Sequence, residues 1–228
     1  MRMPIALASA LVLGLGAVSA EATPIIVNGG FEAVGTYPGW FTSMTAANAP
    51  GWTIGASSEF PIIASNTGCR GTYGAGNQGC NFAVLGGGET GGTGFISQTL
   101  AGFVVGNSYI LNWIQSSEYV AHDTVNVQII GAATLSQNFQ TNPYTAPTLW
   151  DNWTAEAFPF VADAASLTFR FAGTGSTYNN CIAASDSCDP GVDAISLADG
   201  RAPAVPEPMT MLLVGSGLVG VALRRRLS

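Results

Sequence analysis

Hydrophobic and polar residues alternate strictly in short stretches through the middle of the chain. Val125–Ile129 places valine and isoleucine on one side and Asn and Gln on the other, and Leu167–Phe171 repeats the pattern. A period of two indicates a strand with one buried face. Further candidate strands between Gly, Asn and Pro clusters are Ile25–Asn28, Gly51–Ile54, Asn81–Leu85, Phe95–Leu100, Tyr109–Ile114, Thr154–Val161 and Val192–Leu197. Many short strands predict an all-β fold, an antiparallel sandwich or barrel.

The N-terminal segment has the pattern of a secretory signal peptide. Arg2 precedes the apolar run Ile5–Val18, and Val18-Ser19-Ala20 supplies small residues for cleavage. The alternative is an uncut anchor, but the run is shorter than the ~20 residues that a span needs. We expect residues 1–22 to form a helix that a signal peptidase removes.

The C-terminal segment has three parts in a fixed order. Pro206-Glu207-Pro208 ends a Pro-rich linker over 201–208, Met209–Leu223 is apolar and uncharged, and the basic cluster Arg224, Arg225 and Arg226 follows. The cluster places this end in the cytoplasm and the body outside, by the positive-inside rule. Residues 209–228 are therefore expected to form a transmembrane helix with its basic end, and a simple tail anchor is one interpretation.

These three parts resemble the PEP-CTERM sorting signal. The resemblance implies export in a bacterium with a Gram-negative envelope and anchoring in the inner membrane by the C-terminal helix. It also implies processing by an exosortase, which removes that helix. The mature protein is then expected at the outer surface, in the extracellular matrix or released. The part between the two signals, residues 23–200, is expected to be one domain.

Charged residues are scarce and mostly acidic. They make up 9% of the chain, all seven basic residues are Arg, and the net charge is −7. Four of the Arg residues lie in the two terminal segments. A nucleic-acid partner requires a basic surface, so this class is excluded.

Several motifs of the body resemble galactose-binding-like domains, a β-sandwich class that includes many carbohydrate-binding modules. They are Asn28–Glu32, Gly51-Trp52, Phe95–Leu100, Gly106–Tyr109 and Gly191–Leu197. The resemblance implies a jelly-roll β-sandwich and an extracellular polysaccharide as partner. Ala194 departs from it, because a second Asp is common at that position.

The four cysteines form two pairs that are close in sequence. Cys69 with Cys80 and Cys181 with Cys188 are the expected disulfides, because exported proteins are usually oxidised. Four cysteines allow three connectivities, so the sequence leaves the pairing open. A zinc site is the other interpretation, but the spacing is not CxxC and no His is nearby.

Catalytic motifs are missing from the sequence. No Gly-x-Ser-x-Gly elbow accompanies His122, the single histidine, and no spacing brings two acids together. We therefore expect a protein without enzymatic activity. Aromatic residues in loops, three of them near Asn, Asp or Glu, are candidate sugar-stacking residues, and packing in the core is the alternative for each: Tyr37, Trp40, Tyr119, Tyr144 and Trp150. A structural or adhesive surface protein is the alternative function, and a secreted glycoside hydrolase is a third.

A structural calcium site is expected where the two ends of the body meet. In the fold class resembled, the first and last strands are close, so Glu32 and Asp193 are brought together. Two neighbouring carboxylates repel unless a cation or proton lies between them. Calcium takes six to eight oxygens, and Gly30 is a candidate carbonyl donor. The alternative is that both acids cap turns.

Overall fold

Strands and turns make up the part of the chain that the structure describes. The structure, a computed structural model, describes residues 23–33, 41–55, 62–65, 81–86, 94–117, 123–142, 152–174 and 190–200. These residues contain no helix long and apolar enough to cross a membrane. The expected helices at residues 1–22 and 209–228 lie outside the described residues, as does the linker between 201 and 208.

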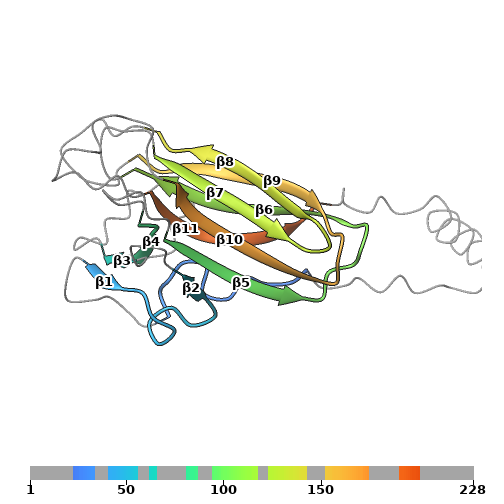
Figure 1. Cartoon of the computed structure of the whole chain (residues 1–228), viewed down its shortest axis with the longest axis horizontal. Coiled ribbons are helices and arrows are strands. Elements are labelled where there is room, and N and C mark those ends of the chain that lie inside the picture. Colours follow the sequence, from blue (N-terminus) through green and yellow to red (C-terminus); the bar gives the residue numbers. More distant parts are fainter. Residues whose placement is uncertain are drawn as a thin grey trace, which may run out of the picture.

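Eleven strands form two antiparallel sheets (Figure 1). The six-stranded sheet has the order β1 (Phe41–Ser43), β3 (Ile62–Ser65), β4 (Asn81–Val84), β11 (Gly191–Asp199), β6 (Ser108–Ser116) and β9 (Thr154–Val161). The five-stranded sheet has the order β2 (Thr53–Gly55), β5 (Phe95–Ala101), β10 (Ser166–Thr174), β7 (Thr124–Ile130) and β8 (Thr134–Gln140). The predicted all-β antiparallel sandwich is confirmed.

Aromatic side chains from both sheets fill the space between them. Trp113 on β6 is buried, and its ring packs edge-on against Phe139 on β8 at 4.6 Å and against Phe171 on β10 at 5.5 Å. Toward the other end, Phe103 packs against Tyr109 and Phe169. The alternating residues of the predicted strands supply this core, so the period-two pattern found the inward face correctly.

The strand predictions fail at four places. Ile25–Asn28 forms no strand, because this segment turns back against β11 and pairs with no neighbour. β1, β3 and β8 were not predicted. The first two are short edge or near-edge strands, and β8 is exposed at all positions except Phe139, so it lacks the alternation that marks a half-buried strand.

The sandwich has two distinct ends. At one end, which we call the loop end, β6 ends at Ser116, which pairs with Gly191 at the start of β11. At the same end, Thr124 at the start of β7 pairs with Gln140 of β8 and Thr174 of β10. At the opposite end, the tail end, Gly200 donates its N–H to the carbonyl of Ser108. The last described residue before the sorting signal therefore lies opposite the loop end.

Candidate functional site

The segment 28–32 folds tightly against an irregularity in β11. The register of β11 on β6 shifts between Asp193 and Ser196. Ile195 donates its N–H to the carbonyl of Gly29 at 3.0 Å. A Cβ on Gly29 would lie 2.0 Å from the carbonyl oxygen of Ile195, so this approach requires glycine.

Left-handed backbone conformations gather at the same place. Asn28, Phe31 and Ala194 have φ values of 53°, 56° and 53°, and they are the only described residues other than glycine with positive φ. Such residues cost about 1 kcal/mol or more each and cluster where the fold fixes a functional geometry. Here Phe31 directly precedes Glu32, and Ala194 directly follows Asp193.

Asp193 is a buried acid beside a second acid. Its residue is 1% exposed, and its Oδ1 accepts a hydrogen bond from the N–H of Ala194 at 2.7 Å. Burial raises the pKa of Asp193 to about 8, the Ala194 N–H lowers it, and the charge of nearby Glu32 raises it further. Glu32 in turn accepts hydrogen bonds from the backbone N–H and the Nδ2 of Asn81.

Among the described residues, no three His, Cys, Asp or Glu side chains form a group that could hold a metal ion, so a cation here would need backbone oxygens. A buried carboxyl beside a carboxylate is stable either with a proton or with a positive ion between them. Gly30 is buried in the same turn, and its carbonyl is the third oxygen that the sequence suggested. Calcium needs six to eight oxygens, which these residues supply only in part.

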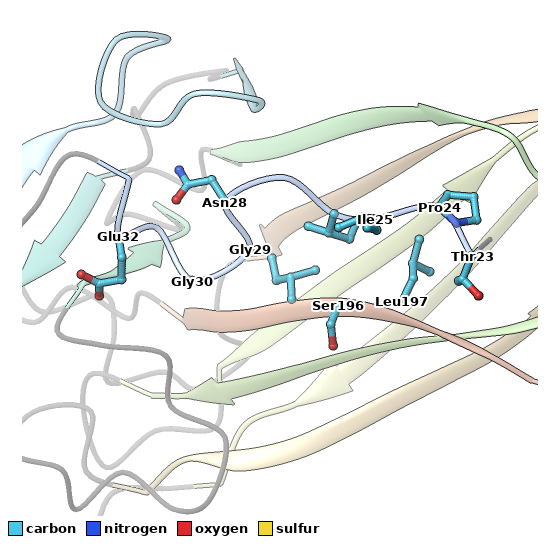
Figure 2. Close-up of a pocket in the computed structure, with 11 residues that line it drawn as sticks. Thr23, Pro24, Ile25, Asn28, Gly29, Gly30, Glu32, Ser196 and Leu197 are labelled. Atoms are coloured by element: carbon cyan, nitrogen blue, oxygen red, sulfur yellow. The ribbon is translucent and has the colours of Figure 1, made fainter.

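A cavity of about 370 Å³ lies between this segment and β11. Figure 2 shows Glu32 toward one end of the lining residues and Thr23 toward the other. The lining includes backbone and aliphatic side chains such as Ile26 and Ile195. The pocket is therefore formed by the first described segment together with the last strand.

The outer side of the five-stranded sheet forms a second candidate surface. The cross-strand register aligns one polar residue from each of four strands in a row: Ser97, Arg170, Gln128 and Ser136. We call the outward residues of these strands the polar sheet face. The members used below are Phe95, Ser97, Thr99, Asn126, Gln128, Ser136, Asn138, Thr168 and Arg170.

Hydrogen bonds between neighbouring strands hold these side chains in place. Thr99 and Thr168 share a hydroxyl hydrogen bond of 2.7 Å. The Nδ2 of Asn126 donates to the Oδ1 of Asn138 at 2.7 Å and to the Oγ of Ser136 at 3.1 Å. The face is thus a fixed array of amides and hydroxyls rather than a set of independent side chains.

Arg170 is the single charged residue in the strands of this sheet. Its guanidinium lies 4.0 Å from the centre of the Phe95 ring, and its Nη1 donates to the Oε1 of Gln128 at 3.1 Å. Burial lowers the pKa of Arg170, although the group stays cationic. A flat guanidinium held on two sides keeps its other N–H groups for a ligand.

None of the aromatic candidates from the sequence can be placed on this surface. Tyr37, Trp40, Tyr119, Tyr144 and Trp150 lie outside the described residues. The four cysteines and the sorting-signal residues 206–208 and 224–226 lie outside them as well. Glu32, Asp193 and Gly30 are described, and the charge of Glu32 contributes to the raised pKa of Asp193.

Sequence reasoning did not single out the polar sheet face. The signal was present, since Asn126, Gln128, Thr168 and Arg170 occupy the outward positions of the alternating strands. A row across strands requires the register, however, and alternation within one strand does not give it. The partner of Arg170, Phe95, lies far away in sequence and meets it only through the pairing of β10 with β5.

Three solved structures show what the fold is similar to. A family 61 carbohydrate-binding module in complex with β-1,4-galactotriose is 12% identical, with a TM-score of 0.50, and the match covers 78% of this chain and 99% of that one. A family 4 module is 11% identical (TM-score 0.40; 76% and 99% covered). A family 35 module from Clostridium thermocellum is 13% identical (TM-score 0.40; 69% and 96% covered).

The sequence comparisons identify only the C-terminal segment. Residues 204–226 match the PEP-CTERM protein-sorting motif, and no curated protein matches the chain. The motif indicates an exported protein that is anchored in the membrane before an exosortase processes it. The chain thus carries a PEP-CTERM sorting motif behind a β-sandwich of the kind found in carbohydrate-binding modules.

Proposed function

We propose that this chain is an exported, non-catalytic protein that binds extracellular polysaccharide through the polar sheet face. The observation that carries the proposal is the row formed by Ser97, Arg170, Gln128 and Ser136 across four strands. Sugar hydroxyls need closely spaced donors and acceptors that are already oriented, which reduces the entropy lost on binding. The cross-strand hydrogen bonds orient these side chains before any ligand arrives.

Arg170 is the centre of the proposed site. Because Phe95 and Gln128 hold its guanidinium, its remaining N–H groups are available to a pair of hydroxyls or to the carboxylate of an acidic sugar. The strands of the face contain no carboxylate. Glycoside hydrolysis generally uses two carboxylates, so the chemistry of this face supports binding without cleavage.

Glycan binding by the full chain tests this proposal. We expect the wild-type protein to bind at least one neutral or acidic polysaccharide on an array, and Arg170→Ala to weaken binding about tenfold or more. Arg170→Lys should recover little, because an ammonium lacks the planar donors. Asn112→Ala, a change on the outward side of the other sheet, is the matched control.

Three results would contradict the proposal. The first is that the protein binds no glycan, which favours the structural or adhesive alternative. In the second, glycan binding survives Arg170→Ala but is lost in Tyr144→Ala or Trp150→Ala, so the sugar-binding surface lies elsewhere. The third is that the protein releases reducing ends from a bound glycan, which supports a hydrolase.

We also propose a structural calcium ion between Glu32 and Asp193, with the Gly30 carbonyl as a further ligand. Buried Asp193 supports it, because the charge of half-buried Glu32 raises the pKa of Asp193, and residues with left-handed backbone adjoin both acids. Because calcium would bind only the folded chain, it should raise the melting temperature. An unchanged melting temperature of the wild type after adding EDTA would argue for turn caps instead.

A further inference from the structure

In the part of the chain that the structure describes, the sandwich has four edge strands, and three of them are poor templates for another strand. β1 and β2 have three residues each. β9 is longer, but it contains Pro159. Exposed edges invite pairing with another chain, and short length and proline are two ways in which proteins prevent it.

The position of Pro159 shows that it affects the free edge. Ala162 donates its N–H to the carbonyl of Asn107, so these two opposed residues form a hydrogen-bonded pair of the antiparallel ladder. Such pairs recur at every second residue of β9, counted back from Ala162. Ile110 and Pro159 form one of the alternate pairs. The N–H that proline lacks would therefore face outward, and the ladder with β6 remains complete.

β8 is the exception among the four edges. It has seven residues, all but Phe139 are exposed, and it contains neither proline nor charge. Thr141, just after β8, donates its N–H to the carbonyl of Asp123, so this opposed pair is hydrogen-bonded and fixes which residues of β8 bond to β7. By alternation, the backbone groups of Thr134, Ser136 and Asn138 face away from β7.

We propose that β8 pairs edge to edge with β8 of a second copy of this chain. A two-fold axis at Ser136 places it opposite Ser136 of the partner subunit, and Thr134 opposite Asn138 of the partner subunit. Antiparallel pairing then satisfies the outward backbone groups of both chains. Each five-stranded sheet becomes half of a continuous ten-stranded sheet.

The charge distribution permits pairing with a second copy. Two copies each carry a net charge of −7, yet β8 and its neighbour β7 contain no charged residue. Like charges opposite one another, which would prevent pairing, are therefore absent at this edge. The side chains that meet on the outward side are serine, threonine and asparagine, which are compatible with their own copies.

The two-fold also fixes the direction of the two subunits. Gly200 lies at the end of the sandwich where β8 begins, so antiparallel pairing points the two tail ends in opposite directions. This geometry suits copies released by processing, or copies on facing surfaces. The polar sheet faces of both subunits then lie on one side of the extended sheet.

Sedimentation of the full chain in mild detergent tests the pairing. It measures the mass of the particle at protein concentrations of about 1–100 µM. We expect a monomer–dimer equilibrium in the wild type. Ser136→Pro should raise the dimer Kd about tenfold or more, because it removes an outward N–H at the axis from each chain. Ser136→Ala keeps that N–H and loses the same hydroxyl, so its Kd should change by less than about threefold.

Two further variants complete the test. Ala157→Pro introduces proline into the β9 edge, which Pro159 already interrupts, and should leave the Kd unchanged. Ser136→Glu places like charges opposite each other and should weaken the dimer even if Ser136→Pro does not fold. A monomeric wild type at every concentration would overturn the pairing, and so would a dimer that both folded Ser136 variants leave unchanged.

Discussion

Asp193 is an acid that is almost fully buried from water, and this burial raises its pKa strongly. Its pKa of about 8 means that the folded protein keeps a proton that the unfolded chain releases near pH 4. The folded state therefore binds more protons between about pH 4 and pH 8. Without a metal ion, stability falls as the pH rises through this range.

We predict that the wild type in EDTA loses up to about 5 kcal/mol of stability between pH 4 and pH 8 from this residue. Asp193→Asn should remove most of that dependence, because an amide does not titrate. Chemical denaturation at several pH values measures it, with Asp199→Asn, an exposed acid of the same strand, as control. Parallel pH profiles for wild type and Asp193→Asn would mean that Asp193 is ionised in the folded protein.

At the scale of elements, turns are held by specific side chains. Asp163, in the turn before β10, accepts hydrogen bonds from the N–H groups of Ala132 and Ala133 in the β7–β8 turn. The two connections at the tail end are thus joined by one carboxylate. Gly131 is adjacent, and a Cβ there would collide with Asp163.

Asp163→Ala is predicted to lower stability by about 1–3 kcal/mol, because two backbone donors lose a charged acceptor. Thermal melts at neutral pH measure the change. Asp163→Asn keeps one acceptor oxygen and should lose less. If alanine costs no more than asparagine, water replaces the carboxylate and the link between these turns contributes little.

The cysteines allow a prediction about connections that the structure does not describe. We predict Cys69–Cys80 and Cys181–Cys188 in the exported protein, on the basis of export and short spacing. Peptide mapping under non-reducing conditions decides the connectivity. A crossed peptide that joins Cys69 to Cys181 would refute the pairing.

At the scale of the molecule, the sorting signal and the sandwich meet at one end. Gly200 is fixed to Ser108, and few residues separate it from the matched motif at 204–226. The loop end therefore lies opposite the residue that precedes the sorting motif.

We predict that an exosortase removes the C-terminal segment, so the intact mass of the surface or released protein should lack residues beyond about Pro208. Glu207→Ala within the Pro-Glu-Pro box should leave the precursor unprocessed in the membrane fraction. A purified surface form that retains Arg224–Arg226 would show instead that the segment is a permanent anchor.

The sequence alone indicated the C-terminal sorting signal and the fold class, and the N-terminal signal peptide stays a prediction. A sorting signal is read as a linear string, so Pro206–Pro208 and the Arg cluster require no folding to be identified. Alternation within Val125–Ile129 or Leu167–Phe171 follows from burial of one strand face, which is a local property. β8 was missed for the same reason, since a strand exposed on both sides has no such pattern.

Only the tertiary structure decided which residues meet. Arg170 reaches Phe95 and Gln128 through pairing with two different strands, and strand order and register are set by packing of the whole core. The high pKa of Asp193 likewise arises from burial next to Glu32, which comes from the other end of the body. Local patterns determine which face of each strand is buried, while contacts between distant segments create the sites.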